Sequence, residues 1–353
     1  MLQPLLRRGT VALALTAAVL ACADEPITTS ALDPTDTPSP VGPGQLPGTT
    51  QYTNPVYAGD FPDPYVLRVG AVYYAYSTNV GVSNVPTLRS SDLVNWEPMG
   101  DALPVLPPWA EAGRRLTWAP AVLASDGVYV LLYTARDHRS GRQCIGRAAS
   151  PTPTGPFLDG SSSPFICQVG LGGSIDASIV RGTAGERYVI WKNDGNCCGQ
   201  PVSLWAQRLG ADARSLVGAP VEILRQDQAW EGSVIEGPTM WEAEGTWHLL
   251  YSANRWNTEH YATGYAECRS PLGPCRKPMT AAIIASDAET SGPGGAEVFT
   301  DLDGHRWLAY HGWTAAKVGY RHGGVRSLRI DRVELAGTQV LVLAPTATSQ
   351  IIP

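Results

Sequence analysis

The sequence predicts an all-β protein built as a five-bladed β-propeller, and three observations lead to this prediction. The 353 residues include 37 glycines and 29 prolines, which favour strands and turns over long helices. Five short runs begin at a glycine and close six residues later on an aromatic residue, and the closing aromatics stand 57, 58, 60 and 59 residues apart. Four-stranded units repeated radially are propeller blades, and five lies within the usual range. The runs are GAVYYAY (70–76), GVYVLLY (127–133), GERYVIW (185–191), GTWHLLY (245–251) and GHRWLAY (304–310). A β-sandwich, or two β domains with chance spacing, is the alternative that the shared offset argues against.

Before these units, the chain opens with features of an export signal. Arg7 and Arg8 precede an apolar stretch from Val11 to Ala21, and small residues follow it. The same residues, VLAC (19–22), also resemble the lipobox of bacterial lipoproteins, in which the cysteine is lipidated. We expect residues 1–21 to be a signal peptide, and the mature protein to be secreted or anchored to the bacterial cell surface at Cys22.

Residues 22–50 are rich in Pro, Thr, Ser and Gly and poor in bulky apolar residues, which predicts a disordered spacer. Residues 51–353 are left for the propeller. The net charge is −6, and no basic run is longer than a pair, so composition argues against a nucleic-acid-binding protein. No apolar run reaches the roughly 18 residues of a membrane span. We expect a monomer whose only membrane contact is a lipid anchor.

Six cysteines remain when Cys22 at the leader boundary is set aside, an even number that suits an oxidising compartment. Their spacings match no zinc site. We therefore expect three disulfides. Among the 15 pairings that six cysteines allow, we favour Cys144 with Cys167, Cys268 with Cys275, and the neighbours Cys197 and Cys198 with each other.

Equivalent positions of the five units should converge at one end of the central channel. Asp63 stands seven residues before the first-unit glycine, and the residues nine before the glycine in units two to five are Trp118, Asp176, Glu236 and Gly295. Three of the five are acids. Clustered acids are costly unless they do chemistry or hold a cation, so this ring predicts a functional site.

The segments around these positions resemble glycoside hydrolase family 43. The resemblance runs from about Asn54 to the C-terminal region. It implies a five-bladed propeller enzyme that hydrolyses arabinan, xylan and related side chains with inversion. The motifs that carry it are NPVYAGDFPDPYV (54–66), SSDLVNWEPMGDAL (90–103), TWAPAV (117–122), GSIDASIV (173–180), IEGPTM (235–240), GPGGAEVFTD (292–301) and GGVRSLRIDRVEL (323–335).

The resemblance also implies a role for each acid. Asp63 would be the general base, Glu236 the general acid, and Asp176 the residue that orients the acid and raises its pKa. Inversion needs a base and an acid about 6.5–9.5 Å apart, with room for a water molecule between them. Each assignment has a rival: Asp63 and Asp176 could serve turns, and Glu231 is the nearest alternative to Glu236.

Sugar binding requires flat apolar faces beside polar groups. Trp118 is the first candidate, followed by Trp313 and Trp256. Arg326 and Asp60 are candidate polar contacts, and a disulfide at Cys197 and Cys198 would form a rigid plate near the pocket mouth or a purely structural turn. No cofactor is required. Many relatives carry a histidine at the position of Gly295, where it helps to bind a calcium ion in the channel. This chain lacks that histidine, which puts the ion in doubt. His311 is either a substitute ligand or an ordinary hydrogen-bonded histidine.

These features favour an exported glycosidase that acts on arabinofuranosyl linkages of a polysaccharide or oligosaccharide. WKNDGNCCG (191–199) and YHGW (310–313) favour the arabinofuranosidase type. A β-xylosidase of the same family is one alternative, and a non-catalytic carbohydrate-binding propeller is another. A protein-interaction propeller would repeat one consensus in every blade, whereas here the shared position differs from blade to blade.

Overall fold

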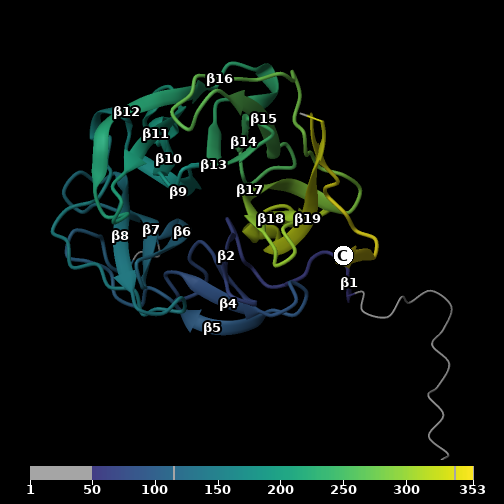
Figure 1. Cartoon of the computed structure of the whole chain (residues 1–353), viewed down its shortest axis with the longest axis horizontal. Helices are drawn as coiled ribbons and strands as arrows, with labels where there is room; N and C mark the ends of the chain where they lie inside the picture. The colour runs from purple at the N-terminus through teal and green to yellow at the C-terminus, as the bar shows by residue number, and fades with distance from the viewer. Residues whose placement is uncertain (1–49, 114–115, 338, 353) are drawn as a thin grey trace, which may run out of the picture. The chain divides into compact units, whose positions relative to one another are not determined.

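A computed structural model describes residues 50–113, 116–337 and 339–352. The predicted signal peptide, Cys22 and the predicted spacer up to residue 49 lie outside the described residues. The described residues form five antiparallel sheets in a ring around a central channel (Figure 1). The predicted five-bladed β-propeller is confirmed.

Each blade is one contiguous stretch of chain whose first strand lies innermost. Blade one holds β2 (Tyr65–Val69), β3 (Val72–Tyr76), β4 (Pro86–Ser90) and β5 (Glu97–Asp101). Blade two holds β6 (Trp118–Ser125), β7 (Val128–Arg136) and β8 (Gln143–Ser150). Blade three holds β9 (Ser174–Arg181), β10 (Arg187–Asn193), β11 (Ser203–Leu209) and β12 (Leu216–Arg225). Blade four holds β13 (Ile235–Ala243), β14 (Thr246–Ala253), β15 (Ala262–Cys268) and β16 (Cys275–Arg276). Blade five holds β17 (Thr290–Thr300), β18 (Arg306–Thr314), β19 (Arg326–Ala336) and β20 (Gln339–Val342).

The repeat seen in the sequence is the hairpin between the first two strands of each blade. Its glycine has a positive φ in every blade, from 60° at Gly70 to 88° at Gly185 and Gly304, which suits a tight hairpin turn. The aromatic residue that closes each run lies on the second strand and is at most 1% exposed in all five blades. These rings pack in the clusters that join neighbouring blades. Burial of one large aromatic per blade therefore explains the strict six-residue offset.

Blade two departs from the prediction of four strands per blade, because within the described residues it has three. The segment that would form the fourth strand is PTPTGPFLDG (151–160). It pairs with β8 only at the bridge between Ala149 and Leu158. Proline has no N–H to donate to a ladder, which limits this segment to a single bridge.

The ring is closed between its last and first blades. β1 (Thr50–Tyr52) pairs with β21 (Gln350–Ile352). The Asn54 side chain pairs with both backbone groups of Ile330, as a neighbouring strand would. Its amide NH2 donates to the Ile330 carbonyl (2.8 Å), and its side-chain oxygen accepts from the Ile330 N–H (3.0 Å). The first described residues are thereby joined to both β21 and β19.

The three predicted disulfides, Cys144–Cys167, Cys197–Cys198 and Cys268–Cys275, are confirmed. Four short 3-10 helices, η1 (Val169–Leu171), η2 (Gly195–Cys198), η3 (Ala229–Glu231) and η4 (Tyr320–His322), lie between strands. Among the described residues, no helix has the length and apolar character needed to cross a bilayer.

Candidate active site

A cavity of about 540 Å³ opens at one end of the central channel. All five blades contribute to its wall, and the five residues of the predicted ring, Asp63, Trp118, Asp176, Glu236 and Gly295, all line it. The size lies in the range typical of small-molecule sites. Three acids more than 50 residues apart in sequence therefore share one pocket.

A distorted backbone on the inner strands presents these residues to the pocket. The φ angle is positive at Asp63 (51°) and Asp176 (57°), two non-glycine residues, and at Gly295 (59°). It is also positive one residue after the ring position in the other two blades, at Ala119 (39°) and Gly237 (51°). The ladders between the first two strands shift register there in blades two to five. Such bulges re-aim side chains, and left-handed non-glycine residues concentrate at functional sites.

Asp63 precedes β2 and is held by residues of its own blade and of blade five. Its Oδ2 accepts a hydrogen bond from the Thr78 hydroxyl (2.6 Å) and lies 3.5 Å from the Arg326 guanidinium. Its backbone N–H donates to His311 Nδ1 (3.0 Å). Burial lowers the pKa of His311 well below its ordinary value, so the ring is neutral and can accept that bond. The Thr78 hydroxyl and the Arg326 guanidinium thereby hold the Asp63 carboxyl group in place.

Asp176 lies on β9 beside Glu236. Burial first, and the Glu236 charge second, raise the pKa of Asp176 to about 8. Its Oδ2 accepts a hydrogen bond from the Gly237 N–H (3.1 Å), which ties it to the residue after Glu236. The buried Asp176 carboxyl group therefore holds its proton near neutral pH.

Both oxygens of Glu236, on β13, have partners. Oε2 lies 2.8 Å from the Lys192 ammonium group, and Oε1 accepts a hydrogen bond from the Tyr261 hydroxyl (2.9 Å). The two partners come from blades three and four and are both buried. The carboxyl group is thereby fixed toward the cavity.

The rival acid, Glu231, lies outside the residues that line the pocket and is fully buried. It caps η3 by accepting from the backbone of Gln228 (3.0 Å), accepts from the Tyr251 hydroxyl (2.7 Å), and pairs with Lys277 (2.7 Å). All of these contacts are structural. The geometry therefore favours Glu236 over Glu231.

An aromatic wall stands on the Asp63 side of the cavity. Trp256 is 39% exposed, lines the pocket, and stacks on Trp313 at 6.2 Å. Trp313, which we expected to contact substrate, is fully buried and supports Trp256 from behind. The Arg326 guanidinium group lies 4.6 Å from the Trp256 ring centre. The backbone N–H of Arg326 donates a hydrogen bond to the Asp60 carboxylate (2.8 Å). Arg326, Asp60 and Trp118 all line the pocket.

The vicinal disulfide lies at the end of η2. Cys197 is exposed and lines the pocket, while Cys198 is partly buried outside the lining and contacts the Arg142 guanidinium. The pocket wall thus includes one sulfur-bearing residue on blade three, the blade that also supplies Asp176.

The residues do not fit a histidine-bound calcium at Gly295. A Cβ there would lie 2.6 Å from both Asp63 Oδ1 and His311 Nδ1, so a side chain cannot be placed without moving both. His311 itself is fully buried: its Nδ1 accepts from the Asp63 N–H, and its Nε2 has no hydrogen-bond partner among the described residues. We derive no chemical step through a cation.

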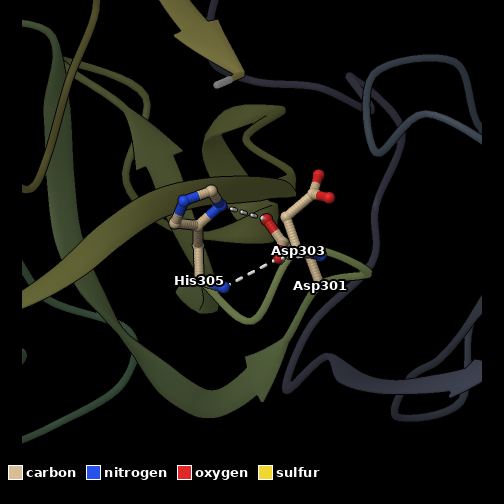
Figure 2. A group of neighbouring side chains, drawn as sticks. All are labelled: Asp301, Asp303 and His305. Atoms are coloured by element: carbon tan, nitrogen blue, oxygen red, sulfur yellow. Dashed lines mark hydrogen bonds and ion pairs between the residues drawn. The ribbon is translucent and has the colours of Figure 1, made fainter.

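A second group of possible metal ligands, Asp301, Asp303 and His305, lies in the turn between β17 and β18 (Figure 2). Asp301 accepts from the His305 backbone (2.8 Å) and lies 3.2 Å from its ring. It also accepts from the Trp307 indole (2.8 Å) and the Asp303 N–H (3.0 Å). These contacts are those of a turn-forming aspartate.

Sequence reasoning missed several pocket residues, of which Lys192 is the most important. Lys192 follows the closing aromatic of blade three by one residue, as His311 follows that of blade five. This shared one-residue offset is the sequence signal that could have identified Lys192 as a pocket residue. Thr78, Tyr261 and Tyr320, which also line the pocket, lie outside the runs that showed the repeat.

Comparison with known proteins adds three findings. The model of the family described as glycosyl hydrolases family 43 matches residues 52–338. A β-D-galactofuranosidase of Aspergillus niger is 26% identical over 74% of this chain and 76% of its own length, and a xylosidase/arabinosidase of Butyrivibrio fibrisolvens is 26% identical over 72% of this chain and 50% of its own length. This chain thus spans only about half of the second relative. The crystal structure of a thermostable family-43 glycoside hydrolase superimposes with a TM-score of 0.74 at 30% identity, covering 85% of this chain and 98% of that one.

Proposed function

The chain belongs to glycoside hydrolase family 43, and from this premise we propose that it is an inverting glycosidase that acts on arabinofuranosyl linkages. The observation that carries the proposal is the shared pocket of Asp63, Asp176 and Glu236, in which the three acids have different surroundings. Acid–base hydrolysis requires such a difference, because one group must accept a proton while another donates one.

We assign the base to Asp63, whose carboxyl group is held by the Thr78 hydroxyl and Arg326. It would take a proton from water as the water oxygen bonds to the anomeric carbon. Glu236 would give its proton to the glycosidic oxygen as the bond between that oxygen and the anomeric carbon breaks. Asp176 would orient Glu236 through its bond to the Gly237 N–H (3.1 Å). One water is consumed, two hydroxyl groups appear, and attack from the face opposite the leaving group inverts the anomeric centre. The chemistry of this family needs no cofactor.

The named relatives guide the choice of sugar. The two curated proteins act on galactofuranosyl, xylosyl and arabinosyl groups, according to their names. α-L-Arabinofuranose and β-D-galactofuranose share the configuration of the furanose ring and differ in the exocyclic chain. A furanosyl donor therefore accounts for two of the three activities, and β-xylosyl substrates are the second candidate.

The pocket offers surfaces that suit a sugar. We propose that Trp256 and Trp118 contact its apolar faces, and that Asp60 and Arg326 bind hydroxyl groups on the Asp63 side. Cys197, on blade three, would contact the leaving group. We also propose that the protein acts outside the cytoplasm, since the N-terminal export features and three disulfides suit that location.

Product analysis by NMR on 4-nitrophenyl glycosides and on arabino- and xylo-oligosaccharides tests the proposal. We expect turnover of arabinofuranosyl substrates with an inverted product. Glu236→Ala should lower kcat on oligosaccharides by at least about 100-fold, the usual contribution of a general acid. Glu259→Ala, at an exposed acid on the same blade, is the control and should retain activity.

Two results would contradict the proposal. Retention of anomeric configuration, or full activity of Glu236→Ala on oligosaccharides, would refute the assigned mechanism. Sugar binding without turnover by the wild-type protein would favour a carbohydrate-binding propeller, and turnover of xylosyl substrates alone would correct the sugar.

A further inference from the structure

A ring of hydrogen bonds joins each blade to the next at the level of the pocket. In four of the five junctions, a side chain at or just beyond the second strand of one blade accepts a bond from a backbone N–H of the following blade's distorted segment. The pairs are Thr78 with Ala119 (2.9 Å), Thr134 with Asp176 (3.3 Å), Ser252 with Gly295 (2.8 Å) and His311 with Asp63 (3.0 Å). We call these four contacts the latch bonds.

The fifth junction, between blades three and four, breaks the pattern. Lys192 occupies the position of the acceptor, one residue after the closing aromatic of blade three. An ammonium group cannot accept a hydrogen bond. The N–H that a latch bond would use, that of Gly237, donates instead to Asp176 Oδ2 (3.1 Å). At this junction a positively charged ammonium group therefore stands where the other four junctions have a neutral hydrogen-bond acceptor.

That charge is directed at Glu236. Lys192 is 1% exposed, and its Nζ lies 2.8 Å from Glu236 Oε2. The other acids that face it are Asp194, at 3.7 Å, and Asp176, and the three acids together raise the pKa of Lys192 despite its burial. A buried ammonium group without such partners would be costly. Lys192 is therefore a fixed cation at the one junction that carries the proposed general acid.

We propose that Lys192 is a positioning residue that stabilises the Glu236 carboxylate as it forms, while Glu236 gives its proton to the glycosidic oxygen. The inference rests on the proposed function and adds a residue to it. A cation already in place when negative charge develops lowers the barrier without reorganisation. Tyr261 holds the other oxygen of Glu236 (2.9 Å), so the carboxyl group cannot turn away from the ammonium group without losing that bond.

The dependence of rate on the leaving group tests this role. A 4-nitrophenolate leaves with little help from an acid, whereas a sugar alcohol requires a proton. Lys192→Met should therefore lower kcat on an oligosaccharide at least about tenfold more than on the 4-nitrophenyl glycoside of the same sugar. Lys192→Gln, which keeps a donor but loses the charge, should show the same selective loss, and Lys192→Arg should restore part of the oligosaccharide rate.

Lys277 provides a matched control. Its side chain is 4% exposed and pairs with the buried Glu231 at 2.7 Å, outside the residues that line the pocket. Lys277→Met should reduce stability and affect both substrates equally. In a Glu236→Ala background, Lys192→Met should cause no further loss on the oligosaccharide, because its effect passes through Glu236.

Each outcome has one meaning. Equal losses on both substrates in Lys192→Met and Lys192→Gln, or a change confined to KM, would overturn the inference. Additive losses in the double variant would do the same. Lack of turnover by the wild-type protein would instead overturn the proposed function. Should Lys192→Met fail to fold by circular dichroism, the comparison of Lys192→Gln with Lys192→Arg decides.

Discussion

The Thr78 hydroxyl group lies between two blades and serves both of them. It donates to Asp63 Oδ2 (2.6 Å) and accepts from the Ala119 N–H (2.9 Å), and it is buried. A hydroxyl group has one donor and two acceptor positions, so one side chain can fix the proposed base and the neighbouring inner strand together.

Thr78→Val keeps the shape of the side chain and removes both bonds. We expect kcat/KM to fall about tenfold or more, and the free energy of unfolding to fall by about 1–3 kcal/mol, because the Ala119 N–H is left without its partner. Steady-state kinetics and urea denaturation measure the two effects. Thr87→Val, at a buried threonine of β4 that donates to the Val85 carbonyl, is the control. Equal kinetic effects of the two substitutions would show that Thr78 acts only through stability.

Single residues also mark the limit of what the sequence predicts. Asp63, Asp176 and Glu236 could be found because each stands at a fixed offset from a repeat. Trp256 and Trp313 could not be ranked, since sequence gives no sign of which tryptophan of a stacked pair faces the cavity and which lies behind it. Stacking depends on a contact between β18 and a loop 57 residues earlier, which composition and periodicity do not encode.

At the scale of elements, the bulges and the latch bonds depend on each other. A bulge turns backbone N–H groups out of the ladder, and a buried N–H without an acceptor is costly. A side chain at or just beyond the second strand of the preceding blade supplies that acceptor in four of the five junctions. The repeat predicted the hairpins and the positions of the inner strands, but it did not predict the bulges, because a bulge is a register shift between two strands rather than a residue pattern.

Ser252→Ala tests a latch bond without touching a proposed catalytic group. The substitution leaves the Gly295 N–H without its acceptor at 2.8 Å, so we expect a loss of about 1–3 kcal/mol in the free energy of unfolding. We also expect kcat to fall severalfold, because the Gly295 backbone lies against Asp63 and His311. The control is Ser327→Ala, which removes a buried hydroxyl of blade five that donates to the Gly312 carbonyl. An unchanged unfolding energy in Ser252→Ala would show that the latch bonds do not stabilise the junctions.

At the scale of the whole molecule, the 60-residue repeat determined the number of blades, while closure of the ring depends on non-repeating residues. Asn54, near the start of the described residues, contacts Ile330 and Asp331 of β19 across sequence separations of 276 and 277. No periodic signal reports such a contact. The fold class could therefore be predicted from the sequence, whereas the side-chain contacts of Asn54 that close the ring could not.

The ring also gathers acids whose protonation should set how stability depends on pH. Burial raises the pKa of Glu297 to about 8, and burial with the Glu236 charge raises that of Asp176 to about 8. Burial raises the pKa of Asp331 to about 6. Burial has the opposite effect on His248 and His311, whose pKa values it lowers. Each acid binds its proton more tightly in the folded chain, and each histidine binds it more weakly.

The sign follows for each pH window. Below about pH 6.5, the histidines increase the free energy of unfolding as pH rises, whereas the acids decrease it. The two effects on stability therefore partly cancel. Between about pH 6.5 and 8 the two histidines are neutral in the folded state and at most half protonated in the unfolded state. Glu297 and Asp176 hold protons in the folded state that the unfolded chain has lost, and this difference is the larger one. The folded state then binds more protons than the unfolded state, so stability must fall as pH rises. We expect the Tm to decrease from pH 6.5 to 8 in calorimetric scans.

Glu297→Gln isolates one contributor, since an amide oxygen can still accept the Ser178 hydrogen bond (3.0 Å) but cannot ionise. One acid that titrates near pH 8 contributes on the order of 1–2 kcal/mol across this window. The variant should therefore lose part of the decrease in Tm between pH 6.5 and 8, while Glu259→Gln, at an exposed acid, should reproduce the wild-type slope. A wild-type Tm that rises with pH across this window would mean that Glu297 and Asp176 are ionised inside the ring, and that other cations there balance their charges.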